Sequence, residues 1–221
     1  MIIVGICGGS GSGSGKSTFA ERIRDGLSCS CEIMRLDCYY FDQGGKPFEE
    51  RTKVNYDSPE IFDFDEMLED IRLLLDGKPV TRKGYNYAEH RRDDSEELMY
   101  PPEVLIIEGI HVFYDDRICD IMNLKLFIKV DSDICLLRRI ARDMNERGRS
   151  LESISEQYKA TVKPMREKYI DKYIDKADVV VMRGGMNEQA LKTTISYLKS
   201  CVKEQRSAES EKNESDGNDS E

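Results

Sequence analysis

Short apolar runs alternate along this chain with longer segments in which apolar residues recur at helical spacing. Five of the runs are typical of strands, and they cover residues 2–7, 32–36, 104–107, 124–130 and 178–182. Most are continuously apolar, as strands buried on both faces of a parallel sheet should be. The alternation therefore predicts an α/β fold, a parallel sheet of about five strands covered by helices.

The segments between these runs predict four helices, because their apolar residues lie three or four positions apart. The helices cover residues 16–27, 61–75, 134–144 and 151–169. Gly77 and Pro79 end the second helix, and Pro164 should kink the long fourth one.

Three stretches fall outside the alternation. Residues 37–59 are rich in aromatic residues and aspartate, and they are too long for an idle connection in a compact domain. Residues 80–100 predict an inserted β-hairpin with polar outer positions. Residues 204–221 contain seven acids, two bases and no apolar period, which predicts a disordered acidic tail after a single folded domain of residues 1–203.

The formal net charge of −10 argues against binding to nucleic acid or to an anionic membrane through bulk charge, which needs a basic surface. No apolar run approaches the ~20 residues of a membrane helix, and the first residues do not resemble an export signal. The seven cysteines and two histidines lack the spacing of zinc ligands. We therefore expect a cytoplasmic protein with reduced thiols, whose phosphate chemistry comes from local sites.

A glycine-rich loop lies between the first predicted strand and the first helix. In this context backbone N–H groups and a helix N-terminus wrap phosphate oxygens. Lys16 would reach the β- and γ-phosphates of a nucleotide, and the Ser17 hydroxyl would hold Mg²⁺. The alternative, a flexible linker, fits poorly between a buried strand and an amphipathic helix. The predicted phosphate-binding residues are Gly8, Gly9, Gly13, Ser14, Gly15, Lys16, Ser17 and Thr18.

The loop departs from the strict spacing Gly-x-x-x-x-Gly-Lys-Ser, because Ser10 stands where the first glycine is required. Treating one Gly-Ser dipeptide as an insertion makes Gly8 the first glycine and restores the pattern. The loop is thus two residues too long. Since its N–H groups must converge on one anion, we hypothesise a bulge that weakens nucleotide affinity.

Two acidic residues follow predicted strands and should lie on the same edge of the sheet. Glu108 is predicted to hold Mg²⁺ directly or through water, although strand-end acids also cap helices. Asp37 would accept the proton of an attacking hydroxyl, as the base of a kinase does, although it could instead only fix its loop. The neighbouring phosphate loop favours the chemical role for both.

Five arginines and no lysine lie within residues 132–149. Arg138, Arg139 and Arg142 fall on a roughly 100°-wide arc of the predicted helix, opposite an apolar stripe at positions 134, 137, 141 and 144. Such an arc is usually a solvated face, but guanidinium groups suit bidentate phosphate contacts. We therefore expect an arginine-rich helical lid, about residues 138–160, that closes over a triphosphate.

The candidate residues lie in motifs that follow one another along residues 1–200. The motifs are Asp37-Cys-Tyr-Tyr, Asn55-Tyr-Asp57-Ser-Pro, Tyr85-Asn-Tyr-Ala-Glu-His90-Arg-Arg, Glu108-Gly-Ile, Arg138-Arg-Ile-Ala-Arg-Asp-Met-Asn-Glu-Arg-Gly-Arg149, Gln157-Tyr, Lys163-Pro and Arg183-Gly-Gly. Together they resemble the uridine kinase (uridine-cytidine kinase) family of P-loop nucleoside kinases, with the family's spacing everywhere except in the phosphate loop. They are far more specific than that loop alone.

The resemblance implies phosphorylation of uridine or cytidine at the 5′-hydroxyl, with Mg²⁺ and with ATP or GTP as donor. Asp37 would be the base and Asp57 the clamp on the ribose 2′- and 3′-hydroxyls, which discriminates against deoxyribonucleosides. The other implied nucleoside-binding residues are Tyr56, Tyr85, Tyr87, His90, Arg142 and Gln157. The implied lid residues are Arg139, Arg142, Arg147 and Arg149, of which Arg142, like Lys16, would also be catalytic. The family further suggests a homotetramer and feedback by pyrimidine triphosphates.

Other functions stay open. A different P-loop small-molecule kinase, such as a phosphoribulokinase or pantothenate kinase, has no need of the hairpin with Tyr85, Tyr87 and His90. A regulatory GTPase would carry an Asn-Lys-x-Asp motif, which this sequence lacks. A third alternative is a homologue whose lengthened loop has weakened catalysis. His111 has no motif partner and is predicted to be structural.

Overall fold

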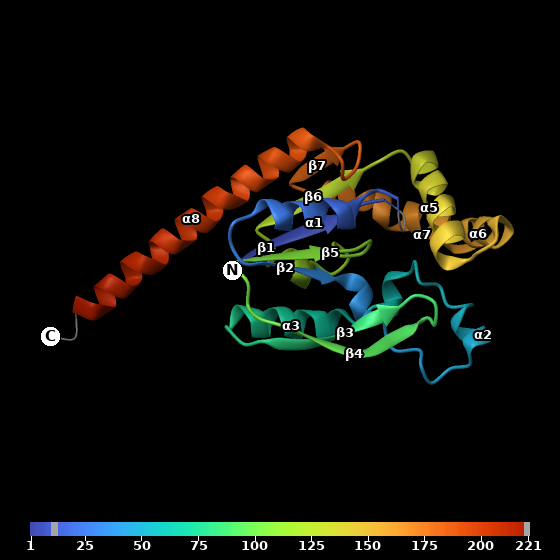
Figure 1. Cartoon of the computed structure of the whole chain (residues 1–221), viewed down its shortest axis with the longest axis horizontal. Coiled ribbons are helices and arrows are strands. Elements are labelled where there is room, and N and C mark those ends of the chain that lie inside the picture. Colours follow the sequence, from blue (N-terminus) through green and yellow to red (C-terminus); the bar gives the residue numbers. More distant parts are fainter. Residues whose placement is uncertain (10–12, 219–221) are drawn as a thin grey trace.

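A five-stranded parallel sheet forms the centre of the molecule (Figure 1). The computed structural model describes residues 1–9 and 13–218, from residue 212 onwards as backbone only. The strand order is β2 (Cys31–Arg35), β5 (Val104–Glu108), β1 (Ile2–Cys7), β6 (Leu124–Lys129) and β7 (Val179–Met182), and all neighbours are parallel. The predicted α/β class and all five predicted strands are confirmed, with bounds that differ by at most one residue at either end.

Side chains of alternate strand residues pack into two separate hydrophobic cores, one on each face of the sheet. Ile2, Val4 and Ile6 of β1 pack with α1 (Lys16–Gly26) and α8 (Glu188–Asn218). Ile3 and Cys7 face the other core, to which α3 (Phe64–Leu75) and α4 (Asp116–Cys119) contribute. Both faces are therefore covered, which explains why the strands are apolar throughout. No helix within the described residues is long and apolar enough to span a membrane.

The predicted hairpin is present as a separate two-stranded antiparallel sheet, β3 (Val80–Asn86) and β4 (Arg91–Met99). Arg82 ties it to the central sheet: its Nη1 donates to the Ile33 carbonyl of β2 at 2.8 Å, and its Nη2 pairs with Glu97 at 2.9 Å. Between α3 and the sheet edge, residues 37–59 hold short pieces of structure rather than an extended loop. These are the 3₁₀ turns Leu36–Tyr39 and Pro59–Ile61 and the short α2 (Phe48–Arg51).

The lid helices α5 (Ser132–Arg147) and α6 (Leu151–Gln157) stand apart from the sheet (Figure 1). A π-helical turn (Tyr158–Val162), α7 (Lys163–Lys168) and a 3₁₀ helix (Ile170–Lys176) follow, and the last of these packs Ile170 and Tyr173 into the core. The fourth predicted helix is thus divided, and its irregular turn comes just before Pro164 rather than at it. Pro164 has no amide hydrogen to continue the helical hydrogen bonds, and the wider turn accommodates this.

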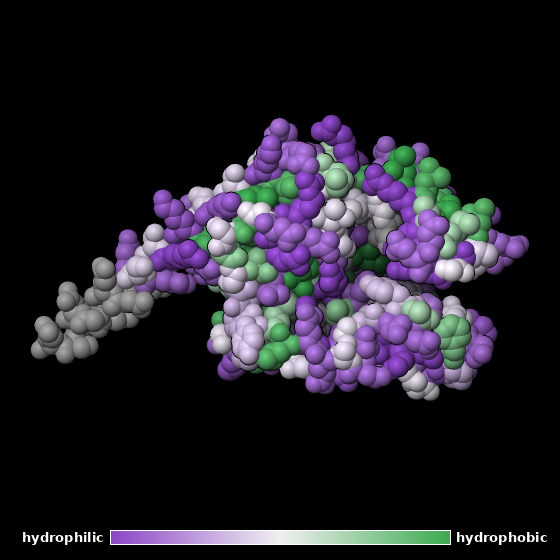
Figure 2. All heavy atoms as spheres, in the orientation of Figure 1, coloured by the Kyte–Doolittle hydropathy of each residue, from purple (hydrophilic) through white to green (hydrophobic). Residues whose placement is uncertain are grey.

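The faces of α5 are the reverse of those of an ordinary amphipathic helix. Cys135, Arg139 and Asp143 are buried, whereas Leu137 is 62% and Met144 46% exposed. Figure 2 shows the corresponding hydrophobic surface over α5. The polar face lies inward because α5 overhangs the cavity described below instead of the apolar core.

The C-terminal segment differs from the predicted disordered tail, since α8 continues from Glu188 to Asn218. Its first half is anchored by apolar residues on the sheet, among them Leu198 and Val202. Further along, Arg206 forms an ion pair with Glu103 at 2.6 Å, and side chains four residues apart interact at Gln205 and Glu209. Helical (i, i+4) contacts and an anchored first half can extend a polar helix that has no apolar period of its own.

Candidate active site

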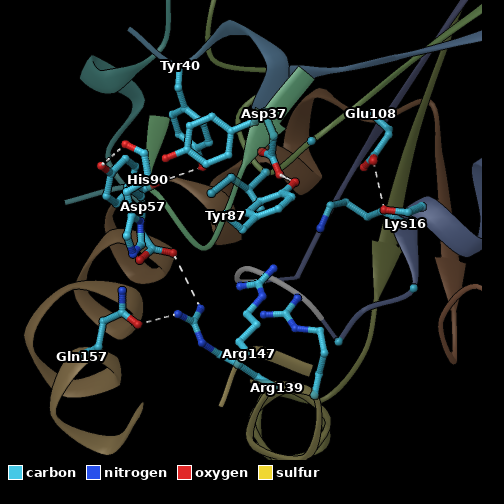
Figure 3. A pocket seen from close by; sticks show the side chains of 18 of the residues that line it. Lys16, Asp37, Tyr40, Asp57, Tyr87, His90, Glu108, Arg139, Arg147 and Gln157 are labelled. Atoms are coloured by element: carbon cyan, nitrogen blue, oxygen red, sulfur yellow. Dashed lines mark hydrogen bonds and ion pairs between the residues drawn. The ribbon is translucent and has the colours of Figure 1, made fainter. Parts of the chain in front are cut away.

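A cavity of about 350 Å³ opens at the carboxyl ends of β1, β2 and β5, between the lid and the hairpin. Figure 2 shows it as a hollow between these two parts, and Figure 3 shows its lining side chains. Its walls come from segments far apart in the sequence. The lining residues are Gly13, Gly15, Lys16, Ser17, Thr18, Asp37, Tyr40, Tyr56, Asp57, Tyr85, Tyr87, His90, Glu108, Gly109, Ile110, Arg139, Arg142, Arg147, Arg149 and Gln157.

Nearly all of the residues predicted for the site therefore meet in one cavity. Gly8, Gly9 and Ser14 are not among the lining residues. They have a different place: Gly8 follows β1, and the buried Ser14 hydroxyl donates to the Gly8 carbonyl at 3.3 Å. These three residues thus support the loop without lining the cavity, whereas Gly13 and residues 15–18 line it.

Two glycines of the phosphate loop have no space for a side chain. Gly8 has φ +128°, and a Cβ there would lie 2.2 Å from the Ile128 carbonyl oxygen. Gly13 has φ +124°, and its Cβ would lie 2.6 Å from the Cys135 carbonyl oxygen. The loop thus packs closely against β6 and α5. Residues 10–12, where the sequence has its extra dipeptide, lie outside the described residues, so the hypothesised bulge stays a prediction.

Lys16 and Ser17 begin α1 and line the cavity, and Figure 3 shows the Lys16 side chain directed into it. The buried Lys16 places Nζ 3.5 Å from the Ser14 hydroxyl. The Ser17 hydroxyl donates to Glu108 Oε1 at 2.9 Å, and burial raises the pKa of Glu108. A hydroxyl and a carboxylate side by side are hard oxygen ligands, and the phosphate oxygens of a nucleotide on the loop would add others. This donor set fits Mg²⁺.

Asp37 lies two residues beyond the end of β2, in the 3₁₀ turn Leu36–Tyr39. Its Oδ2 accepts a hydrogen bond from the Tyr87 hydroxyl at 2.6 Å. Burial and the charge of Asp37 raise the pKa of Tyr87, so the phenol stays protonated and donates. The Arg147 guanidinium lies over the Tyr87 ring, 4.7 Å from its centroid. One tyrosine thus connects the candidate base to the lid.

Asp57 lies on the opposite side of the cavity and is 6% exposed. Its Oδ2 accepts from the Thr161 hydroxyl at 3.3 Å, and its Oδ1 lies 3.9 Å from Arg139 Nη1. Burial raises the pKa of Asp57, and the nearby Arg139 opposes this. The carboxylate is therefore desolvated and only weakly paired, as expected of a group that waits for hydroxyl donors.

His111 supports Asp57 from behind the cavity wall. The fully buried imidazole donates through Nε2 to the Asp57 carbonyl oxygen at 2.8 Å, and its Nδ1 lies 2.9 Å from the Tyr173 hydroxyl. Because a carbonyl can only accept, Nε2 carries the proton and Nδ1 accepts from the tyrosine. Burial lowers the pKa of His111 to about 4, so the ring is neutral at pH 7.

Aromatic side chains line the end of the cavity near the hairpin. Tyr56 stacks on His90 with ring centroids 5.1 Å apart, and Tyr40 lies edge-on to Tyr56 at 5.4 Å. Tyr85 lies 4.7 Å from Tyr40. Burial, followed by nearby arginines, lowers the pKa of His90, which favours its neutral form. The cavity thus has a flat aromatic end opposite its cationic loop.

The lid arginines converge on the same space. Gln157 Oε1 accepts from Arg139 Nη2 at 2.9 Å (Figure 3). The same oxygen accepts from Arg149 Nη1 at 2.6 Å. Arg138 points elsewhere and donates to the Gly13 carbonyl at 2.8 Å, which ties the lid to the phosphate loop. The cavity can therefore hold an anion between Lys16 and the lid arginines. Against Asp37 and Asp57 it can hold a molecule with hydroxyl groups that donate hydrogen bonds.

Comparison with known proteins agrees with this geometry. The sequence matches the model of the phosphoribulokinase/uridine kinase family over residues 3–190. The chain belongs to this family. Among its relatives, the uridine kinase of Ligilactobacillus salivarius (strain UCC118) is 41% identical over 203 residues, 91% of this chain and 94% of that protein. The uridine kinase of Streptococcus uberis (strain ATCC BAA-854 / 0140J) is 43% identical over 204 residues, 92% of this chain and 96% of that protein.

The family's fold also appears at low sequence identity. The structure is similar to that of phosphoribulokinase from Rhodobacter spheroides, with a TM-score of 0.59 at 13% identity over 82% of this chain and 69% of that one. This likeness shows the shared P-loop kinase fold, as predicted from the sequence. The likeness in fold carries no information about the phosphate acceptor.

In this family member, several residues belong to the site or support it although no role there was predicted for them. Gly109 and Ile110 line the cavity, and both stand in the Glu108-Gly-Ile motif, from which only Glu108 was given a role. Thr161 and His111 reach Asp57 from 104 and 54 residues away, and neither carries a sequence signal for this contact. Tertiary structure alone brings these groups together.

Proposed function

We propose that the protein transfers the γ-phosphoryl group of ATP or GTP to the 5′-hydroxyl of uridine or cytidine. One observation carries the proposal: a single cavity joins the phosphate loop with Lys16 to Asp37, Asp57 and an aromatic end. The names of the relatives support the same reading. A ribonucleoside offers an aromatic base, vicinal hydroxyls and a primary hydroxyl, which suit the aromatic end, Asp57 and Asp37 in turn.

The donor end is cationic. Lys16 and the lid arginines would hold the phosphate oxygens and stabilise the charge that develops on the transferred group. Ser17 and Glu108 would hold Mg²⁺, which when bound shields the charge of the β- and γ-phosphates. The remaining work of this end is positioning, because phosphoryl transfer needs little other chemistry from the protein.

The acceptor end selects and activates the nucleoside. Asp57 would accept hydrogen bonds from both ribose hydroxyls, and Tyr85 and His90 would form hydrogen bonds with the edge of the pyrimidine ring. The 5′-hydroxyl oxygen attacks the γ-phosphorus, a new P–O5′ bond forms, and the bond to the β-phosphate oxygen breaks. Asp37 accepts the hydroxyl proton, and ADP or GDP leaves.

A cytoplasmic location and a homo-oligomer form part of the proposal. The strand β7 is an edge of the sheet, and its Val179, Val180 and Met182 are exposed. An unpaired apolar edge strand is a surface that a second copy can cover. Sedimentation equilibrium would show a tetramer if this holds and a monomer if it does not.

An acceptor panel tests the proposed function. Donor consumption is measured with uridine, cytidine, adenosine and ribulose 5-phosphate, and 5′-deoxyuridine serves as a matched ligand without the attacking hydroxyl. We expect turnover with the two pyrimidine ribonucleosides and inhibition without turnover by 5′-deoxyuridine. Turnover with ribulose 5-phosphate instead would indicate a phosphoribulokinase rather than a uridine kinase. No turnover with any acceptor would favour a weakened nucleotide-binding homologue.

A further inference from the structure

A single buried carboxylate lies at the centre of the lid arginines. Asp143 is 0% exposed, on the inward face of α5. Its Oδ1 accepts from Arg142 Nε at 2.9 Å and lies 3.5 Å from Arg147 Nη1. Its Oδ2 lies 3.6 Å from Arg139 Nε and 3.5 Å from Arg149 Nη1.

Asp143 has more charged neighbours than the pairing of one carboxylate requires, although only Oδ1 is hydrogen-bonded and Oδ2 has ion-pair contacts alone. A buried charge needs a partner, and one bidentate arginine would serve. Here four guanidinium groups surround one carboxylate, and all four line the cavity whereas Asp143 itself does not. The single negative charge of Asp143 therefore does not neutralise the four arginines, and an excess of positive charge faces the cavity.

The four arginines would not hold this arrangement by themselves. Arginine side chains are long and flexible, and like charges at this spacing repel one another. Further oxygens limit the freedom of two of them: Gln157 Oε1 accepts from Arg139 and Arg149, both the hydroxyl and the carbonyl of Ser153 accept from Arg149, and the more distant Asp57 Oδ1 lies near Arg139. Asp143 is the group that contacts all four. Its backbone carbonyl, in addition, accepts from the N–H groups of Gly148 and Arg149 at the end of α5.

We propose that Asp143 is a positioning residue for phosphoryl transfer, which holds the four lid arginines in register and competes with the nucleotide for them. The proposal rests on the proposed function, since it assigns these arginines to the donor. The proposal predicts that removing the carboxylate affects nucleotide binding and catalysis differently. Without the carboxylate the guanidiniums attract an anion more strongly, but they no longer point to fixed places, so ground-state binding is kept and transition-state stabilisation is lost.

The variant Asp143→Asn tests this difference between ATP binding and turnover. It keeps the shape of the side chain and the backbone hydrogen bonds while removing the charge. We expect kcat with uridine to fall about 10- to 100-fold, a typical effect of misplacing groups that stabilise developing charge. The Kd of ATP, measured by calorimetry without acceptor, should stay equal or decrease. Glu146→Gln is the matched control, because Glu146 is an exposed acid on the same helix.

The two readouts separate this proposal from its alternatives. An unchanged kcat overturns it, and so does a loss of ATP affinity that accompanies the loss of kcat, because a merely structural role damages both together. If the asparagine variant does not fold, Asp143→Glu keeps the charge but moves it by one methylene. A lower kcat with unchanged ATP affinity then supports the proposal, and wild-type turnover overturns it. Absence of uridine turnover in the wild type would refute the proposed function instead.

Discussion

The substitution Asp57→Asn should lower activity without lowering stability. The carboxylate is desolvated, and its contacts are long: 3.3 Å to the Thr161 hydroxyl and 3.9 Å to Arg139. Burial raises its pKa despite the arginine. Without a ligand, the ionised form is therefore poorly compensated, and hydroxyl groups of a bound ribose would supply the missing hydrogen bonds.

The sign of the stability effect follows from that pKa. A carboxyl group with a higher pKa in the folded than in the unfolded protein contributes stability below its unfolded pKa, and this contribution is lost as the pH rises through the folded pKa. At neutral pH the ionised Asp57 thus destabilises the unliganded protein. The asparagine variant avoids this loss, so its melting temperature should equal or exceed that of the wild type.

The activity moves in the opposite direction. A hydrogen bond to a charged acceptor contributes about 1.5–3 kcal/mol, and the amide of asparagine replaces one such acceptor by a donor. Loss of one ribose contact should therefore lower kcat/KM for uridine roughly 10- to 150-fold. The effect on 2′-deoxyuridine should be smaller, because that substrate already lacks one hydroxyl. The preference for the ribonucleoside should shrink accordingly.

The assay is steady-state kinetics with uridine and 2′-deoxyuridine, together with thermal melting of the unliganded protein. Asp120→Asn, at an exposed aspartate after α4, controls for a change of charge alone. If Asp57→Asn retains the wild-type preference for uridine, Asp57 is not the ribose clamp. If the variant melts well below the wild type, the carboxylate is a structural partner of the lid rather than an uncompensated charge.

Three further predictions concern neighbouring features. His111→Gln moves the carbonyl that the imidazole holds, so the preference for uridine over 2′-deoxyuridine should fall several-fold while the KM of ATP stays constant. Tyr87→Phe removes the hydrogen bond that orients the Asp37 carboxylate, so kcat for uridine should fall several-fold while the KM of ATP stays constant. Deletion of Gly11 and Ser12 restores the strict loop spacing and should tighten ATP binding in calorimetry.

Each of these has a clear contrary result. A histidine variant that melts lower but keeps its substrate preference would leave only a structural role for the imidazole. A wild-type kcat in Tyr87→Phe would mean that the tyrosine does not orient the base. Unchanged ATP affinity after the loop deletion would show that the two extra residues do not disturb phosphate binding.

The sheet and the phosphate loop could be predicted because their signals are local. The residues of β1 and β5 are apolar on both faces, and the glycines before Lys16 meet a steric demand that only glycine satisfies. The sequence motifs also brought nearly the whole cavity together, from Asp37 to Gln157.

Two features could not be predicted, for physical reasons. The arginines of α5 indicated a face directed at the ligand, but the periodicity did not show that Asp143 lies buried on that face beside Arg139, because its burial depends on the segments around the cavity. The helix α8 continues past Val202 without an apolar period, because its start is anchored and because Arg206 pairs with Glu103. Both outcomes depend on tertiary neighbours that are far away in the sequence.

The turnover of Asp37→Asn tests the central claim most directly. This variant keeps the size of the side chain and removes the base, so kcat for uridine should fall roughly 10²- to 10⁴-fold, the usual contribution of general base catalysis. The Kd values of uridine and ATP, measured separately, should stay within a few-fold of the wild type. Turnover close to that of the wild type would contradict the assignment of the base, and with it the proposed placement of the 5′-hydroxyl in the cavity.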